Sequence, residues 1–198
     1  MHESSRKRRL VVGISGASGA IIGISLLAAM RQYEEWETHL VISNGGRRTI
    51  EQETGYTVRQ VEALATACHP IEDIGASIAS GTFKTEGMVV APCSMKTLAG
   101  VASGFSHNLL LRACDVTLKE RRRLVLAVRE SPLSSVHLRN MTTAASVGAI
   151  LLPPVMTFYN RPETIEDMVR HIVGKALDIF GLELTGFRRW GEENAARS

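Results

Sequence analysis

The ten residues Val11–Ala20, VVGISGASGA, decide the fold class of this chain. An apolar stretch runs directly into a turn of glycine and serine, and an apolar helical pattern follows. Gly16 and Gly19 permit a tight turn and a close approach of the backbone to a ligand, and the amides at a helix start attract anions. The stretch therefore predicts a strand, a phosphate-binding turn and a helix.

The spacing of the glycines narrows the class of ligand. Gly13, Gly16 and Gly19 follow GxxGxxG, which differs from the GxGxxG of dinucleotide-binding folds, and no lysine follows as in a P-loop. The next apolar stretch, 38–42, ends at Ser43 and lacks the acidic residue that binds a ribose diol. These features favour a mononucleotide phosphate such as that of FMN, while plain turn glycines are the alternative.

Strand and helix patterns alternate along the rest of the chain. Strands are predicted at 10–14, 38–42, 87–91, 124–128 and 149–152, and helices at 20–33, 43–53, 95–101, 108–120, 134–147 and 163–180. Continuous apolar strands separated by helices indicate a parallel sheet covered on both faces. We therefore expect one three-layer, flavodoxin-like (Rossmann-like), doubly wound α/β domain. Residues 55–84 are the least regular and are expected to form a loop near the site.

Length and composition suit one such domain. The 198 residues are 44% hydrophobic, enough for one sizeable core and too few for two ordinary domains. We expect a basic N-terminal extension over 1–9, a domain over 10–183 and a tail over 184–198. The net charge is only +3, and the basic runs at 6–9 and 121–123 lack neighbouring aromatic residues, which argues against nucleic-acid binding.

The cysteines and the N-terminal pattern point to the cytoplasm. Cys68, Cys93 and Cys114 are odd in number and lack CxxC or zinc-finger spacing, so we expect reduced thiols and no structural metal. Glycines and serines interrupt the apolar run at 10–30, which argues against a signal peptide or a membrane helix.

Polar residues follow the ends of the predicted strands, where parallel sheets bind their ligands. They are Ser18, Ser43 and Glu53, the run Pro92–Thr97, Arg129, Glu130 and Tyr159. Hydroxyls and cations suit phosphate and flavin edges, and carboxylates suit proton transfer. No serine, histidine and acid come together in this set. Ordinary alternatives exist: solvated charges for Glu53 and Lys119, packing for Cys93, and helix capping for His137.

Seven ordered motifs together resemble the UbiX-type flavin prenyltransferases, in particular the branch once named after phenolic acid decarboxylases. The motifs are GASGA (16–20), PCSMKTL (92–98), RACDV with LKE (112–120), RE (129–130), HLRNM (137–141), FYNRP (158–162) and RWG (189–191). The resemblance covers residues 10–191.

The resemblance implies a metal-independent transferase that joins a dimethylallyl group from dimethylallyl phosphate to N5 and C6 of reduced FMN. The prenylated FMN serves a UbiD-type decarboxylase. The family also implies a large homo-oligomer, often a dodecamer, with sites between protomers. We expect the tail over 184–198 to pack on a neighbouring subunit.

The resemblance further implies a role for each matching residue. FMN would be held by Gly16, Ala17, Ser18, Ser43, Ser94, Met95, Lys96, Thr97 and Arg129. Dimethylallyl phosphate would be surrounded by Lys119, Arg129, Glu130, Tyr159, Lys175 and Trp190. The catalytic residues would be Ser18 and Glu53, which manage protons near N5 and C6, together with Lys119 and Glu130. Cations suit the departing phosphate, and Glu130 could supply it with a proton.

Departures from the family pattern leave the proposed catalytic groups in place. Lys175 stands where arginine is common, which keeps the charge and loses bidentate binding of a phosphate. Two alternatives stay open, a non-enzymatic flavin carrier and a flavin-dependent decarboxylase of the same fold. The decarboxylase would need a histidine after the second strand, where Asn44 stands, and a PASANT-like motif in place of Pro92–Met95.

Overall fold

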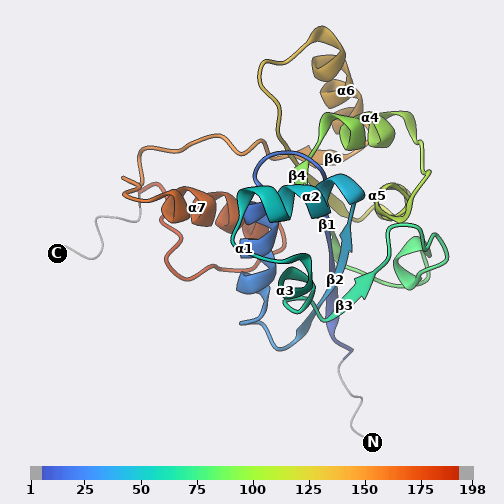
Figure 1. Cartoon of the computed structure of the whole chain (residues 1–198), viewed down its shortest axis with the longest axis horizontal. Coiled ribbons are helices and arrows are strands. Elements are labelled where there is room, and N and C mark those ends of the chain that lie inside the picture. Colours follow the sequence, from blue (N-terminus) through green and yellow to red (C-terminus); the bar gives the residue numbers. More distant parts are fainter. Residues whose placement is uncertain (1–5, 192–198) are drawn as a thin grey trace, which may run out of the picture.

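Six parallel strands form one central sheet in the order β3-β2-β1-β4-β5-β6 (Figure 1). The computed structural model describes residues 6–191. The strands are β1 (Arg8–Ile14), β2 (Trp36–Ile42), β3 (Ala67–His69), β4 (Gly87–Cys93), β5 (Arg123–Val128) and β6 (Ala149–Leu151). The order reverses between β1 and β4, and the crevice outside the carboxyl ends at such a reversal is where ligands bind in α/β sheets.

In the described part of the chain, seven α-helices connect and cover the strands. They are α1 (Ala20–Met30), α2 (Asn44–Glu53), α3 (Val58–Glu62), α4 (Met95–Ser103), α5 (Leu109–Lys119), α6 (Ser135–Ser146) and α7 (Ile165–Asp178), with a 3₁₀ turn η1 (Ser77–Ala79). Polar side chains cap several of the starts, as at Ser43, Ser94 and Asn108. His137 completes the capping box of α6 with Ser134, which confirms its capping role.

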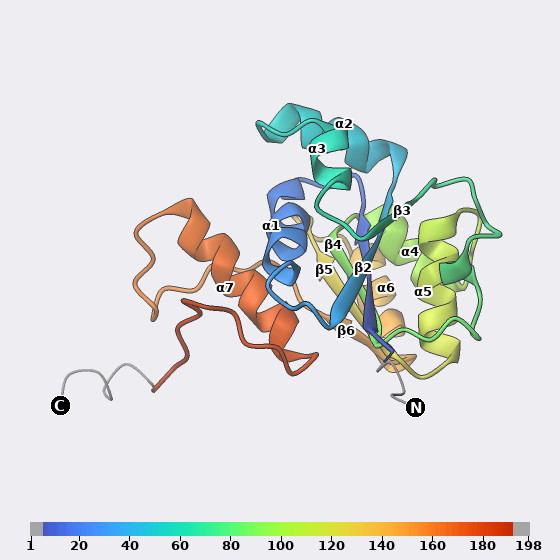
Figure 2. The ribbon, with the colours of Figure 1, turned by 90° about the horizontal axis from the view of Figure 1, so that it is seen from below.

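The sheet separates two hydrophobic cores. Figure 2 shows α1 and α7 on one side of the sheet and α4, α5 and α6 on the other. Successive residues of β1 alternate between the cores, so that Val12 packs toward α1 and α7 while Val11 packs toward α4 and α5. Helices therefore cover both faces of the sheet through apolar residues of the strands, which confirms the predicted three-layer architecture.

The prediction for residues 55–84 was wrong in detail, because this segment contains α3, β3 and η1. The edge strand β3 has three residues and pairs with β2, where Thr38 and Thr66 each donate a backbone amide to the other's hydroxyl at 3.1 Å. So short a strand has no periodicity to read. Without β3 the strand order is that of flavodoxin, and with β3 it is the Rossmann order.

None of the helices within residues 6–191 is long and apolar enough to span a membrane. Strand β1 begins at Arg8, inside the segment expected to be an extension. Residues 1–5, and residues 192–198 of the predicted tail, lie outside the described residues.

Candidate functional site

A cleft of about 720 Å³ lies at the carboxyl ends of β1, β2, β4 and β5. Seven residues predicted for the site line it: Gly16, Ser43, Ser94, Met95, Lys96, Thr97 and Glu130. These residues come from four separate connections of the chain. The structure therefore brings most of the predicted flavin-binding set together at the reversal of strand order.

Close contact between two backbones shapes the floor of the cleft. A Cβ atom added to Gly16 would lie 2.8 Å from the Cα of Gly45, and one added to Gly46 would lie 2.5 Å from the Ile14 carbonyl oxygen. Only glycine allows the turn after β1 and the start of α2 to approach this closely. Packing therefore explains the glycines at positions 45 and 46.

Serine hydroxyls tie the strand ends together, and Ser43 and Ser94 belong to the lining of the cleft. The buried Ser15 hydroxyl donates to the Pro92 carbonyl oxygen at 2.9 Å and accepts from the Ser94 amide at 2.8 Å. The Ser43 and Ser94 hydroxyls accept from the Gly46 and Thr97 amides at 3.0 and 3.2 Å. The Ser43 hydroxyl keeps its own hydrogen and can donate it to a ligand, whereas the Ser94 hydroxyl also lies 3.1 Å from the Thr97 hydroxyl, and either of these two can be the donor.

The Glu53 carboxylate reaches the turn after β1. Its Oε2 accepts from the Gly19 amide at 2.8 Å and from the Ala20 amide at 3.5 Å. The start of α1, where the sequence predicted a bound phosphate, therefore already binds a carboxylate, which the helix dipole favours. Ser18 precedes Gly19, so the Glu53 carboxylate contacts the turn that carries Ser18, the other residue predicted to manage protons.

Arg129 and Glu130 follow β5 directly, and both are exposed. The Arg129 amide donates to the Cys93 carbonyl oxygen at 3.0 Å, which holds this pair beside the end of β4. Cys93 itself is fully buried, and burial raises the pKa of its thiol to about 12. The thiol is therefore a packing group and not a nucleophile.

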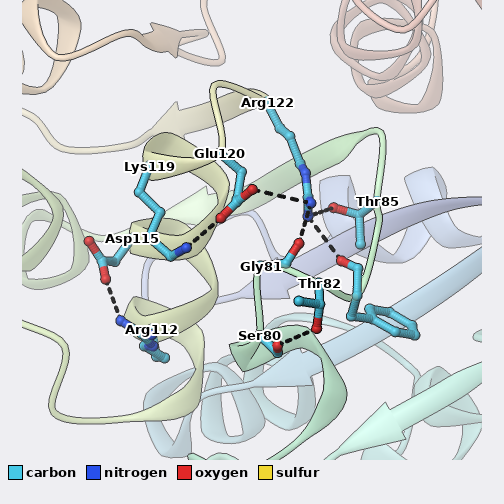
Figure 3. Close-up of polar contacts among 10 residues, drawn as sticks. Ser80, Gly81, Thr82, Thr85, Arg112, Asp115, Lys119, Glu120 and Arg122 are labelled. Atoms are coloured by element: carbon cyan, nitrogen blue, oxygen red, sulfur yellow. Dashed lines mark hydrogen bonds and ion pairs between the residues drawn. The ribbon is translucent and has the colours of Figure 1, made fainter.

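Lys119 lies far from the cleft of its own chain. A single copy therefore does not bring all of the predicted site residues together. Helix α5 starts at the cleft, where its cap residue Asn108 is part of the lining, and its eleven residues carry Lys119 roughly 16 Å away. Figure 3 shows the Lys119 ammonium directed at the Glu120 carboxylate, beside the loop that Arg122 holds. Arg122 donates to the carbonyl oxygens of Gly81 at 2.6 Å and Phe83 at 3.0 Å.

Tyr159, Lys175 and Trp190 form a third group at α7, which carries Lys175 and the ring of His171 against which Tyr159 packs. The Tyr159 ring packs edge-on against His171 of α7 and against Trp190, with centroids 5.6 and 5.2 Å apart. Lys175 is exposed one turn after His171. None of these three described residues lines the cleft, and Trp190 is 79% exposed.

Sequence reasoning missed about half of the lining. The missed residues are Asn44, Gly45, Ile71, Glu72, Ile74, His107, Asn108 and Leu111. The Gly45-Gly46 doublet was a usable signal, and the segment 71–74 belongs to the loop that the sequence placed near the site. Nothing in the sequence around His107 and Asn108 indicated a ligand site; it indicated only that a helix begins there.

The chemistry of the cleft suits a flavin mononucleotide. Hydroxyl and amide donors from three connections can bind phosphate and polar ring edges, while Ile71, Ile74 and Leu111 offer apolar contact. Within residues 6–191, no three His, Cys, Asp or Glu side chains come together in a way that could hold a metal ion.

Comparison with known proteins also points to a protein that binds a flavin. The family model described as Flavoprotein matches residues 1–177. The chain is 51% identical over 185 residues to the flavin prenyltransferase UbiX of Escherichia coli K12, which covers 92% of this chain and 98% of the relative.

Two solved structures are also similar at a TM-score of 0.91. One is a dodecameric FMN-dependent UbiX-like decarboxylase from Escherichia coli O157:H7, with 51% identity, 92% of this chain and 98% of that chain covered. The other is AnUbiX in complex with FMN and dimethylallyl pyrophosphate, with 50% identity, 93% of this chain and 98% of that chain covered.

Proposed function

Since this chain belongs to the UbiX-type flavin prenyltransferases of the Flavoprotein family, we propose that it joins a dimethylallyl group from dimethylallyl phosphate to N5 and C6 of reduced FMN. It is a transferase that acts on FMN. The observation that carries the proposal is the contact of Glu53 with the turn that holds Ser18, beside a cleft lined by the flavin-binding motifs.

The flavin supplies the nucleophilic atoms N5 and C6 when it is bound. Gly16, Ala17, Ser43 and the run Ser94–Thr97 would bind and orient it at the strand ends. Ser18 and Glu53 would move protons near N5 and C6, a task that needs reach and the correct protonation state. The exposed Glu130 would give a proton to the departing phosphate.

Cleavage of the allylic carbon–oxygen bond leaves negative charge on the phosphate, which cations must stabilise. Arg129 directly precedes Glu130, which lines the cleft, whereas Lys119 and Lys175 lie elsewhere in the same chain. We therefore propose that Lys119, Tyr159, Lys175 and Trp190 reach the site from neighbouring copies. Trp190 would offer an aromatic face to the allylic cation.

Exposed apolar side chains support a homo-oligomer, which we propose to be a dodecamer. Val155, Met156 and Phe158 are 60 to 70% exposed in the segment after β6, and Val136 and Leu138 are exposed on α6. A patch of this kind marks an interface in proteins that associate. The same association would bring the exposed Trp190, near the end of the tail, against a neighbour.

We further propose that the product serves a UbiD-type decarboxylase, and that the protein acts in the cytoplasm. The second proposal is supported by the free thiols of Cys68, Cys93 and Cys114.

A flavin carrier and a flavin-dependent decarboxylase are the competing functions. A decarboxylase of the expected kind would place a histidine after β2, where Asn44 lines the cleft. A flavin carrier would not need the Glu53 carboxylate, which is hydrogen-bonded to the turn after β1.

The decisive experiment is anaerobic incubation of the purified protein with reduced FMN and dimethylallyl phosphate, without metal, followed by mass analysis of the released flavin. We expect a gain of one five-carbon unit. Glu130→Gln should bind FMN and form this product slowly. Unmodified flavin from a protein with proven FMN binding would favour the carrier.

A further inference from the structure

The chain reverses direction at the end of α5, and this turn gathers three charged side chains. The Arg122 amide donates to the Thr117 carbonyl oxygen at 2.9 Å, and Arg121 has a positive φ of 56°. This bond and this φ are those of a Schellman turn, which fixes how the chain leaves a helix. The turn therefore brings the side chains of Lys119, Glu120 and Arg122 together, as Figure 3 shows.

Arg122 is the largely buried support of this group, with a side chain that is 14% exposed. Its guanidinium donates to the carbonyl oxygens of Gly81 at 2.6 Å and Phe83 at 3.0 Å, and to the Thr85 hydroxyl at 3.4 Å. Its Nη2 also lies 3.9 Å from Oε2 of Glu120. A planar guanidinium held by several acceptors is pre-organised, so it offers Glu120 a positive charge at a fixed place.

Glu120 connects this support to Lys119. Its Oε1 accepts a hydrogen bond from the Lys119 ammonium, while its Oε2 faces Arg122 (Figure 3). This hydrogen bond and the charge of Lys119 lower the pKa of the Glu120 carboxyl, so it is ionised at neutral pH. The carboxylate of Asp115, one turn earlier on α5, is paired with Arg112 at 2.7 Å. Glu120 is therefore the carboxylate that holds Lys119.

The backbone of Gly81 lies directly against this ion pair. A Cβ atom added to Gly81 would lie 2.1 Å from Oε1 of Glu120 and 2.8 Å from Nζ of Lys119. Exposed ion pairs between long side chains are usually loose and contribute little to stability. The packing against Gly81 limits the movement of both side chains, so this pair is held in place.

The group keeps the properties that binding of a phosphate needs. Lys119 and Arg122 bring two positive charges and Glu120 one negative charge, so the group stays positive. The ammonium has three hydrogens, and Glu120 uses one of them, which leaves two for a ligand. The Lys119 side chain is 46% exposed, which leaves it open to a ligand from another copy. A lysine that is already held loses less rotamer freedom when it binds.

We propose that Glu120 is a positioning residue for the reaction. It holds the Lys119 ammonium where the donor phosphate of a neighbouring copy meets it, and Arg122 and the Gly81 backbone support it. The inference rests on the proposed function, in which Lys119 reaches that phosphate from another copy. A carboxylate without this role would only repel a phosphate, so its removal would strengthen donor binding. The positioning role requires the opposite effect.

The test is a double-mutant cycle read as donor binding. Dimethylallyl phosphate is titrated calorimetrically into the full-length protein loaded with oxidised FMN, whose N5 is not a nucleophile, so binding is measured without reaction. We expect Lys119→Ala and Glu120→Ala each to weaken donor binding by about tenfold, since a hydrogen bond to a charged group is lost or loosened. In the Lys119→Ala background, Glu120→Ala should weaken binding no further, because its partner is gone. Glu86→Ala, which breaks another exposed ion pair, should leave binding unchanged.

Two results of the cycle would overturn the proposal. One is a Glu120→Ala protein that binds the donor as well as the wild type or better, and the other is an equal weakening in both backgrounds. The FMN affinity and the size of the oligomer should be unchanged in Glu120→Ala. A loss of either would give Glu120 a structural role and would also overturn the proposal.

A further variant leaves every charge in place. Gly81 does not have a positive φ, so Gly81→Ala causes no backbone strain, but the new Cβ must displace the ends of Glu120 and Lys119. Gly81→Ala should weaken donor binding several-fold, whereas Gly55→Ala, with nothing within 4 Å of its new Cβ, should not. Equal donor affinities in the two glycine variants would overturn the support by Gly81.

The same experiments separate this inference from the proposed function. If the wild type binds the donor and prenylates reduced FMN but the two substitutions act additively, only the positioning role of Glu120 fails. If the wild type does not bind the donor, the proposed function fails, and the positioning role fails with it.

Discussion

At the scale of single residues, Glu53 illustrates how one carboxylate can have both a structural and a chemical role. Glu53 is the last residue of α2, and its carboxylate accepts hydrogen bonds from the amides of Gly19 and Ala20, directly after Ser18. Glu53→Gln keeps an oxygen for the Gly19 amide and removes the base. We expect FMN binding to persist and prenylation to slow by about a hundredfold or more, measured in single-turnover reactions. Glu51→Gln on the same helix is the matched control, and an unchanged rate in Glu53→Gln would remove the base from the mechanism.

Gly16 tests the close approach of two backbones beneath the cleft. In Gly16→Ala the new Cβ would lie 2.8 Å from the Cα of Gly45, which is backbone and must shift. We expect a loss of about 1 to 3 kcal/mol in the free energy of unfolding and at least a tenfold weaker binding of FMN, measured by flavin fluorescence. Gly55→Ala is the control, because nothing lies within 4 Å of its new Cβ. Equal FMN affinities in both variants would contradict the assigned packing.

At the scale of elements, the edge strand β3 depends on a histidine pair. His39 Nδ1 of β2 lies 3.0 Å from His69 Nε2 of β3, and the rings stack with centroids 5.3 Å apart. Burial lowers the pKa of His39 from 6.5 to about 4, aided by the charges of His69 and Arg9. The unfolded chain therefore takes up this proton at a higher pH than the folded chain does.

The sign of the pH dependence follows from this difference. Stability should be complete above pH 6.5 and should fall as the pH drops toward about 4, by at most roughly 3 kcal/mol. Urea unfolding across this range measures the loss. His39→Gln should flatten the slope, whereas His107→Gln, at an exposed histidine, should keep it. A slope that survives in His39→Gln would mean that other groups cause the acid sensitivity.

At the scale of the whole molecule, the predicted site is divided into three parts. The flavin motifs meet at the strand ends, and Lys119 lies at the far end of α5. Tyr159 packs against Trp190 and against His171 of α7. A single chain cannot bring Lys119 to the cleft without unfolding α5. Association of copies is the arrangement that we propose to unite them.

Mixed oligomers test this association directly. Lys119→Ala and Glu53→Gln proteins should each be nearly inactive alone. Co-expressed as hybrids, they should regain part of the prenylation activity, because some sites would then combine an intact Glu53 with an intact Lys119 from another copy. Activity of the purified hybrid, compared with a mixture of separately assembled variants, is the measurement. Absence of recovery would place both residues in one chain's site or remove Lys119 from it.

The amino-acid sequence by itself determined the alternation of elements, the three layers and the edge of the sheet where ligands bind. These properties are local: apolar periodicity, glycine turns and capping side chains act over a few residues, as in Val11–Ala20. The predicted chemistry came from the family motifs, which stand in this chain in the same order as in the family.

Only the tertiary structure decided which distant groups meet. Strand β3 forms by pairing with β2. The Glu53 carboxylate accepts a hydrogen bond from the Gly19 amide, 34 positions earlier in the chain. The length of α5 separates Lys119 from the cleft. The contact of Arg122 with the Gly81 carbonyl oxygen likewise became visible only once these two segments were packed together. Such contacts depend on the packing of elements far apart in the chain, which local propensity does not encode.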